Sequence, residues 1–459
     1  MTVAARAPAS TPFPTSSEAL MARLVHQREQ VPLLYGTLPL DTWPERYTED
    51  MAQPSVLMPA FAHRRETLLR NRELVERIRT YTFMGDVVAD AYACLIPSLG
   101  FRKLVDMLAL ACDRGVEAVP DAPPELHAFV REMEGVPDWV DMDLVAQGAR
   151  ASRNSMAHIA PLVIRGAFFG TFTNQYTALP MALTGALSNE TSGRRVLETA
   201  TFFTLSTLPG ALDRHGAGFK AAAQVRLMHA MVRFHALTKP GLWNTQVYGI
   251  PIPQVDQMPA GLISAYLVAQ RALQRPGQQF TPDERAQVEL ARYRCHLLGL
   301  PAELLPDTPQ ALVDVLQTRH ATLRAGFDDA TCGALIRSTM AADLGRDPGW
   351  AGGVRARCEP SVARLFFVRN FMGGDFARAE RIGVTVSRRD KLRAAVGMGL
   401  GVLTMAPYAL AQRVPGVRAA ADRRLVRKLG TLLQRYGHAD FTTDAAHYRP
   451  GATAAAQRS

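Results

Sequence analysis

AAAQVRLMHAMVRFHAL, residues 221–237, contains no Gly or Pro and is apolar on almost every side. This composition is typical of a helix buried inside a protein rather than of one that covers its surface. Three basic residues interrupt the stretch: Arg226, His229 and Arg233. Their spacings of three and four residues place all three on one face of a helix. The stretch therefore predicts a central helix with two cations and an imidazole in the core.

Two cations in a protein core are costly unless an anionic group meets them. The charges on either side also disfavour protonation of His229, which suits a neutral metal ligand better than a base. One interpretation is an iron porphyrin, with His229 on the metal and Arg226 and Arg233 near the propionates. The other is that the arginines pair with buried carboxylates and His229 donates to a carbonyl, since a single buried histidine is usually structural. The spacing alone leaves both open.

The composition limits the classes of protein that this chain can belong to. A hydrophobic content of 47% supports a large core, and 52 Lys and Arg against 42 Asp and Glu give a net charge of +10. Such a charge suits nucleic acid or an anionic membrane. No basic stripe interleaved with aromatics, finger spacing or RNP-like run is present, so we expect no nucleic-acid partner. Gly-rich phosphate loops, HExxH and GxSxG are also absent, which argues against nucleotide-driven chemistry and the common hydrolases.

The cysteines indicate the compartment. The five cysteines are Cys94, Cys112, Cys295, Cys332 and Cys358. They are odd in number and never paired as CxxC, which argues against a disulfide framework, a zinc site and covalent haem attachment. The pattern fits a reducing compartment, and the N-terminus lacks the features of a signal peptide. We therefore expect a cytoplasmic protein.

Strand-like alternation is scarce, and no repeat or sharp composition shift divides the chain. We expect one all-α domain over residues 18–440, a disordered N-terminus at 1–17 and a flexible tail at 441–459. The one β-rich patch is GVTVS at 383–387. Helices are expected over residues 17–27, 60–81, 124–134, 141–157, 260–273, 280–300 and 309–325.

Two apolar stretches need separate treatment. Residues 160–187 predict an irregular buried segment of two helices with a break near Pro180. Ser192 is expected to cap the following helix at its N-terminus, and Pro209 to end it.

Residues 394–411 form a second apolar run, flanked by basic residues and followed by a basic amphipathic stretch. It is long enough to reach across a bilayer but contains Gly397, Gly399, Gly401 and Pro407. One interpretation is peripheral contact with an anionic membrane through residues 391–428. The other is a buried hairpin followed by a solvated basic helix.

The run RRVLETATFF…GFKAAAQVRLMHAMVR, residues 194–233, resembles the core motif of the latex clearing protein and MpaB-type oxygenase family. That family has an Arg-x-x-x-Thr element followed by VR-x-x-HA-x-VR. Here Arg195 and Thr199 form the first element, and residues 225–233 form the second. GIPIPQVDQM at 249–258 and YRCHLLGLPAELLPDTP at 293–309 also resemble family segments, in the same order.

The resemblance implies an all-α, enlarged globin-like fold around one non-covalent haem b. It implies that His229 is the proximal iron ligand, that Arg195 and Thr199 lie in the helix across the porphyrin, and that Arg226 and Arg233 support the haem. For Arg195 and Thr199 the alternative is a buried hydrogen bond that only holds two helices together.

The chain departs from the family pattern at two positions. The latex-cleaving enzymes carry a lysine just before the motif threonine and a glutamate upstream of the motif arginine. This chain has Glu198 and Leu179 there. Glu198 can pair with Arg194 one helical turn away, or act as an acid or base at the iron. A rubber-cleaving mechanism is therefore not carried over as a whole.

We expect a haem b-dependent oxidoreductase, an oxygenase that uses O₂ or peroxide on a small lipophilic substrate such as an isoprenoid. A cavity lined in part by residues 160–187 and Phe202–Phe203 is expected to hold that substrate. Arg195 and Thr199 would orient or polarise the oxidant, and Glu198 is a candidate acid or base. Two alternatives are a non-enzymatic haem sensor or carrier, and a helical membrane-surface protein without metal.

Overall fold

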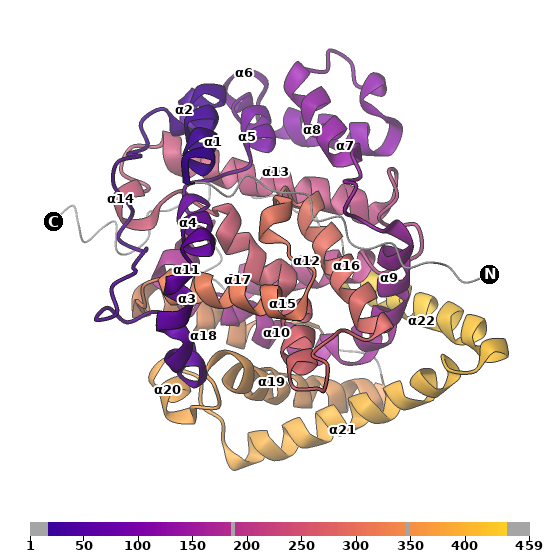
Figure 1. Ribbon diagram of the computed structural model, residues 1–459. Coiled ribbons are helices and arrows are strands. Elements are labelled where there is room, and N and C mark those ends of the chain that lie inside the picture. The colour runs from indigo at the N-terminus through magenta and orange to yellow at the C-terminus, as the bar shows by residue number, and fades with distance from the viewer. Residues whose placement is uncertain (1–16, 185–188, 346–348, 438–459) are drawn as a thin grey trace.

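The computed structural model describes residues 17–184, 189–345 and 349–437, which form helices and turns with no β-strand (Figure 1). The all-α prediction is confirmed. The GVTVS patch lies in the turn before α21 (Arg388–Ala411), because it has no partner strand to complete a ladder. The termini predicted to be disordered lie outside the described residues, apart from Ser17, which begins the first helix.

The first half of the chain contains short helices. They are α1 (Ser17–Gln30), α2 (Pro32–Tyr35), η1 (Pro59–Arg64), α3 (Arg65–Arg70), α4 (Arg72–Thr80), α5 (Val87–Ala93), α6 (Ile96–Leu99), α7 (Phe101–Arg114), η2 (Val116–Ala118), α8 (Pro124–Glu134), α9 (Met142–His158), α10 (Ala160–Gly170), α11 (Gln175–Leu183) and α12 (Asn189–Leu205).

The second half contains most of the long helices. They are α13 (Ala217–Thr238), α14 (Thr245–Tyr248), α15 (Gln254–Leu273), α16 (Pro282–Leu297), η3 (Ala302–Leu304), α17 (Pro309–Thr322), η4 (Asp329–Gly333), α18 (Ala334–Ala341), α19 (Gly349–Phe371), α20 (Phe376–Arg381), α21 and α22 (Pro415–Tyr436).

Helix α13, which contains the quoted stretch, crosses the middle of the molecule (Figure 1). It packs against α2, α5, α7, α12 and α16, and fourteen of its 22 residues are buried. Three consecutive alanines, 221–223, are fully enclosed and let neighbouring helices approach closely. The helix ends at Thr238, just before Pro240, which cannot continue it. The prediction of a buried central helix is confirmed.

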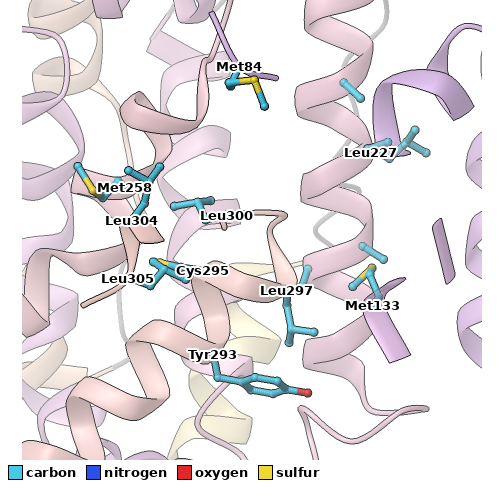
Figure 2. Close-up of a cluster of buried hydrophobic side chains, with 14 of the residues drawn as sticks. Met84, Met133, Leu227, Met258, Tyr293, Cys295, Leu297, Leu300, Leu304 and Leu305 are labelled. Atoms are coloured by element: carbon cyan, nitrogen blue, oxygen red, sulfur yellow. The ribbon is translucent and has the colours of Figure 1, made fainter. Parts of the chain in front are cut away.

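The main core joins α13 to the helices around it. Figure 2 shows Leu227 of α13 and Met133 of α8 on one side, and Met258 of α15 with Leu300 on the other. All four side chains are almost completely buried in one cluster. Full burial of an aliphatic side chain of this size stabilises a fold by about 1.5–3 kcal/mol. The core therefore anchors α13 in a fixed position, and with it the polar face of the helix.

Several helix boundaries differ from the predictions. Of the segment predicted at 160–187, residues 185–187 lie outside the described residues. The part up to residue 184 does form two helices, but the break comes at 171–174, where the Asn174 side chain accepts from Tyr176 N and caps α11. Pro180 lies inside α11. Ser192 does not cap α12, which begins at Asn189; its hydroxyl instead bonds to Ser338 at 2.8 Å. The local hydrogen bonds of Asn174 decide the break more strongly than the proline does.

Two more predicted helices have different limits. Residues 60–81 divide at Asn71, whose side chain accepts from Leu74 N and starts α4. Within α4, Glu73 and Arg77 lie one helical turn apart and form an ion pair at 2.8 Å. The helix expected at 260–273 begins at Gln254, with Pro259 inside it. Gln254 and Gln257, the glutamines of the GIPIPQVDQM segment, are therefore helical and buried.

The apolar run of 394–411 belongs to α21, one continuous helix of 24 residues rather than a buried hairpin. It lies along one outer edge of the molecule, against α19 and α9, and α22 turns away from its end (Figure 1). Gly397 and Gly401 do not break the helix. They face the body closely, since an added Cβ would lie 2.8 Å from Cys358 Cβ and 2.9 Å from Ile159 Cδ1. Helix α21 is long and apolar enough to cross a membrane, but only 17% of its most apolar window is buried.

Candidate functional site

Arg226 is the first of the three polar residues on one face of α13, before His229 and Arg233. Its Nη2 donates to Asp86 Oδ1 and to Glu132 Oε1, both at 2.8 Å, and its Nε donates to the second oxygen of Asp86. Asp86 also caps α5 by accepting from Ala89 N. Charge-assisted hydrogen bonds of this kind are stronger than neutral ones. One guanidinium thus ties α13 to the start of α5 and to α8.

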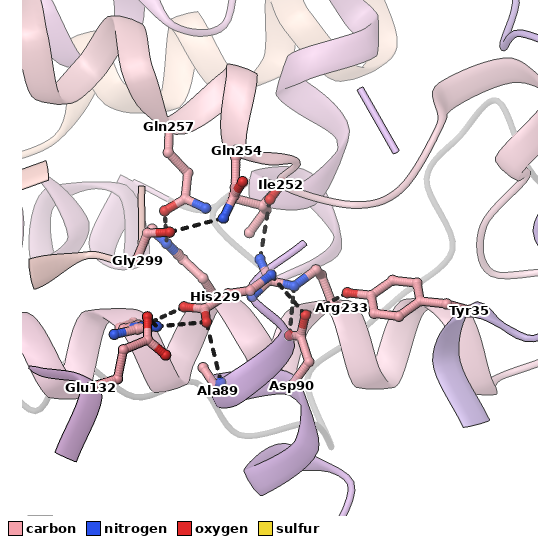
Figure 3. Close-up of polar contacts among 12 residues, drawn as sticks. Tyr35, Ala89, Asp90, Glu132, His229, Arg233, Ile252, Gln254, Gln257 and Gly299 are labelled. Carbon is pink, nitrogen blue, oxygen red and sulfur yellow. Dashed lines mark hydrogen bonds and ion pairs between the residues drawn. The ribbon is translucent and has the colours of Figure 1, made fainter. Parts of the chain in front are cut away.

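Arg233 makes the second ion pair of this face. Its Nε lies 2.7 Å from Asp90 Oδ1, both side chains are completely buried, and its Nη1 donates to Ile252 O at 3.1 Å. The Tyr35 hydroxyl donates to the other oxygen of Asp90 (Figure 3). Burial raises the pKa of Asp90 to about 6, with Arg233 opposing the rise and Asp86 adding to it. Arg233 Nη2 is enclosed and has no hydrogen-bond partner among the described residues.

For the arginines, the structure matches the second of the two sequence interpretations: both pair with buried carboxylates. The buried carboxylates are those of Asp86 and Asp90, and Arg226 also pairs with the more exposed Glu132. The sequence does contain a sign of these partners, because Asp86 and Asp90 lie four residues apart in the apolar segment DVVADAYA, 86–93. Whether Arg226 and Arg233 also support a cofactor stays a prediction.

His229 lies between the two ion pairs. Its Nδ1 is 3.1 Å from Gln257 Oε1 (Figure 3). An amide oxygen only accepts, so Nδ1 carries the proton and Nε2 carries the lone pair. Burial and then the charge of Arg233 lower the pKa of His229 to about 4, so the imidazole is neutral at pH 7. His229 as a residue is partly rather than completely buried.

Helix α12 carries the Arg-x-x-x-Thr element beside α13. Arg195 Nη1 donates to Glu198 Oε2 at 2.9 Å, and Arg194 Nε lies 3.5 Å from Glu198 Oε1. Thr199 donates its hydroxyl to Arg195 O within the same helix, at 2.9 Å. The charge of Arg195 contributes to the low pKa of His229, so α12 brings this guanidinium within electrostatic range of the imidazole. The pair predicted between Glu198 and Arg194 is present, and Arg195 joins it.

Gly299, in the YRCHLLGLP segment, lies directly over the first ion pair. Its φ of +85° is a left-handed conformation, and an added Cβ would lie 2.3 Å from Asp86 Oδ2 and 2.8 Å from Arg226 Nε. Its carbonyl accepts from Gln254 Nε2 at 2.8 Å. Only glycine meets both requirements, which gives a physical reason for the residue at this position.

We expect Gly299→Ala to lower the free energy of unfolding by about 2–4 kcal/mol, because it adds left-handed strain and pushes Asp86 away from Arg226. The measurement is the thermal unfolding midpoint. Gly115→Ala is the matched control, since Gly115 has a φ of +87° with no atom within 4 Å of an added Cβ. Equal losses in both variants would contradict the predicted collision with the ion pair.

A hollow of about 370 Å³ reaches Asp86 and Glu132 from the outside, and Trp139 and His296 also line it. The apolar cavity predicted along 160–187 and Phe202–Phe203 stays a prediction. Phe202 is buried in the main core, and the Arg294 guanidinium lies 5.2 Å from the centre of the Phe203 ring.

Within the described ranges, no three His, Cys, Asp or Glu side chains gather closely enough to hold a bare metal ion. What this region offers is one neutral imidazole with a fixed tautomer. A single imidazole donor suits a metal ion whose other ligands belong mostly to a cofactor, such as the iron of haem.

Comparison with known proteins identifies the chain's relatives. The family model described as "ER-bound oxygenase mpaB/B'/Rubber oxygenase, catalytic domain" matches residues 161–403, more than half of the chain. The chain belongs to this family. The match covers α12, α13 and the segments on both sides of them, so the resemblance predicted from the motifs is confirmed.

Two known proteins are similar to this chain. The rubber oxygenase of Streptomyces sp. (strain K30) is 25% identical over 292 residues, which are 57% of this chain and 70% of that protein. A solved structure of latex clearing protein in the closed state matches with a TM-score of 0.52 and 19% identity, over 77% of this chain and 91% of that one. The structural match supports the all-α fold that the resemblance implied. Because its family is one of oxygenases, the chain is an enzyme of the oxygenase class.

Proposed function

We propose that this protein is a haem b-dependent oxygenase in which His229 would hold the haem iron. The observation that carries the proposal is the state of His229: a neutral imidazole whose Nδ1–H is fixed by Gln257 and whose Nε2 lone pair is available. Histidine ligands in metal sites commonly donate the other ring N–H to an oxygen in this way. Family membership supports the same assignment.

The residues around His229 fit such a group. A porphyrin supplies four of the iron ligands, so a single protein imidazole suffices where a bare ion would need a cluster. Arg233 keeps Nη2 without an acceptor, and a propionate oxygen is the kind of acceptor that would satisfy it. Arg226 already gives Nε and Nη2 to carboxylates, so we propose that it supports the haem indirectly, by holding α13 against α5.

Haem bound at His229 would supply the redox chemistry by which O₂ or peroxide oxidises a small lipophilic substrate, such as an isoprenoid. We propose that Arg195 places a positive charge beside the reacting groups and orients the oxidant. Glu198 holds that guanidinium in position through its 2.9 Å contact, a role that its two arginine neighbours favour over that of a free acid or base. Thr199 has committed its proton to Arg195 O, so it can only accept a hydrogen bond.

We propose the cytoplasm as the location. All five cysteines are free, and burial raises the pKa of Cys112 and Cys295 to about 12, which keeps these thiols protonated. Free, protonated thiols suit a reducing compartment.

The experiment that tests the proposal is an absorption spectrum of protein expressed with ample haem supply, followed by oxygen uptake with an isoprenoid oligomer. We expect a Soret band, one haem per chain, and oxygen uptake with formation of carbonyl products. A colourless protein would overturn the proposal. A Soret band without uptake on any lipophilic substrate would favour the sensor or carrier alternative.

The low pKa of His229 predicts how haem binding depends on pH. Ligation needs the neutral imidazole, and a pKa of about 4 means that protons compete only at low pH. We expect the dissociation constant, measured by Soret titration, to stay constant from pH 8 to 5 and to rise about tenfold per pH unit below pH 4. Haem binding that begins to weaken near pH 6.5 would show that the His229 imidazole has the pKa of a solvent-exposed histidine.

A further inference from the structure

Helix α21 leaves an apolar surface uncovered. Fourteen large hydrophobic side chains are exposed in the described part of the chain, and eight of them fall within residues 392–417. These eight are Leu392, Val396, Leu400, Val402, Leu403, Leu410, Val414 and Val417. Residues 394–412 contain no charged side chain. A soluble monomer rarely exposes so many neighbouring apolar groups, which marks this surface as a site of interaction.

The two faces of α21 have different roles. Ala394, Gly397 and Gly401 form a narrow buried stripe against α19, α9 and α10. Leu403 and Leu410, 68% and 63% exposed, lie on the opposite side of the helix. Leu392 and Val396 share that outer face, because their spacings of four and seven residues match the helical repeat. The helix is thus apolar both toward the protein and away from it.

The charge around α21 is strongly one-sided. Residues 388–435 contain eleven Lys or Arg and two Asp, so this segment carries +9 of the chain's net +10. Both acids are already bonded within the protein: Asp390 to Ser361 at 2.7 Å, and Asp422 to Arg153 at 2.5 Å. The exposed charge of the segment is therefore positive.

Helix α22 presents much of this charge. Leu425, Leu429 and Leu432 are buried against the body of the protein. Arg423, Arg424 and Arg427 are exposed, and the helical repeat places them on the face away from those leucines. An apolar ridge on α21 thus leads into a cationic face on α22.

We propose that α21 and α22 together dock this protein on an anionic membrane, with α21 lying in the plane of the interface and the α22 arginines on lipid phosphates. An apolar helix face beside Lys and Arg is the pattern of interfacial helices. The buried stripe of α21 packs along the body, so the helix cannot cross the bilayer without leaving the fold.

The positive charge of the segment favours an anionic membrane over a second copy of the chain as the partner of this surface. A symmetric dimer through α21 would bring the same +9 segment of two chains together, and like charges at an interface are costly. Anionic lipid headgroups have the opposite sign and attract the segment. The proposal concerns the protein with or without cofactor, so it stands apart from the proposed function. A lipophilic substrate dissolved in the bilayer would then lie beside the enzyme.

The test is flotation of the full chain with phosphatidylcholine vesicles, with and without about 30% phosphatidylglycerol, at low and high salt. We expect binding to the anionic vesicles only, weakened by salt. Reversing the α22 charges (Arg423→Glu, Arg424→Glu and Arg427→Glu) is expected to lower the partition coefficient by at least fivefold per cation removed, the equivalent of about 1 kcal/mol each. The pair Leu403→Glu and Leu410→Glu should lower it by more than tenfold.

Leu33→Glu is the matched control, since Leu33 is 58% exposed on α2, away from this surface, and should leave binding unchanged. All these positions are exposed, so unchanged thermal midpoints are expected and show that each variant is folded. No binding to anionic vesicles would overturn the proposal. So would a salt-stable dimer that Leu403→Glu and Leu410→Glu abolish. Protein that resists an alkaline carbonate wash would instead indicate a spanning helix and contradict docking in the plane.

Discussion

His229→Ala is expected to remove the Soret band of the purified protein and to weaken haem binding by more than about 100-fold. The basis is that residues next to a ligand already contribute about 10–100-fold, and the ligand itself contributes more. The described residues offer no cluster of metal-binding side chains that could take its place. The substitution also affects a partly buried residue whose ring makes a single hydrogen bond, so we expect the fold to survive it.

Three comparisons separate a ligand from a merely structural histidine. Gln257→Leu removes the acceptor of the Nδ1 proton and should weaken haem binding by about 10–100-fold, between the parent and His229→Ala. His235→Ala removes a second buried histidine from α13 and should keep the Soret band. Added imidazole should restore the band in His229→Ala if the side chain acts only through its ring. Unchanged haem affinity in His229→Ala would contradict the assignment.

The central helix could be predicted because its signal is local. Apolar residues on every side of 221–237 indicate burial, and a spacing of three and four places Arg226, His229 and Arg233 together. What lies opposite them could not be predicted, because their partners are distant in the sequence. Asp86 is 140 residues from Arg226, and Asp90 is 143 residues from Arg233. The same spacing is therefore compatible with propionates and with carboxylates until the packing of α5 on α13 is known.

Helix limits were least predictable near proline and glycine, the residues that most often break helices. Pro180 and Pro259 both lie inside helices, and Gly397 and Gly401 serve as close-packing positions in α21. A proline removes one backbone donor, and neighbouring packing can offset that loss. Asn174 determines a helix start through a side-chain hydrogen bond that composition alone does not reveal.

The sequence predicted which residues make up the candidate site better than it predicted the role of each residue. The Arg-x-x-x-Thr and His elements do come close, since the charge of Arg195 affects the pKa of His229. Glu198 was open between two roles, and its contact with Arg195 depends on rotamers that the sequence does not specify. Gln257 was missed, because a glutamine at the start of a helix has no pattern that distinguishes a ligand's partner from a surface residue.

Substituting Asp90 and substituting Arg233, the two members of the buried ion pair, are expected to lower the free energy of unfolding by different amounts. Asp90→Asn leaves a guanidinium in the core that cannot lose its proton, and the cost should be about 3–5 kcal/mol. Arg233→Met leaves a carboxylate whose pKa is already raised to about 6 beside the arginine and rises further without it. That carboxyl can become neutral by taking up a proton, so its cost at pH 6 should be smaller, about 2–3 kcal/mol.

The pH dependence of stability distinguishes the two variants. A carboxyl whose pKa is higher in the folded state than in the unfolded one binds protons more tightly when folded, so stability falls as pH rises toward the folded pKa. In the parent this loss from Asp90 is complete near pH 6. In Arg233→Met it continues above pH 6, by about 1.4 kcal/mol per pH unit, whereas Asp90→Asn has no such group. Thermal midpoints at pH 6, 7 and 8 measure this. Relative to the parent, the Arg233→Met midpoint should fall by about 1.5 °C per pH unit, and the Asp90→Asn difference should stay constant. A constant difference for both variants would mean that Asp90 remains ionised without its partner, and that water or another cation reaches it.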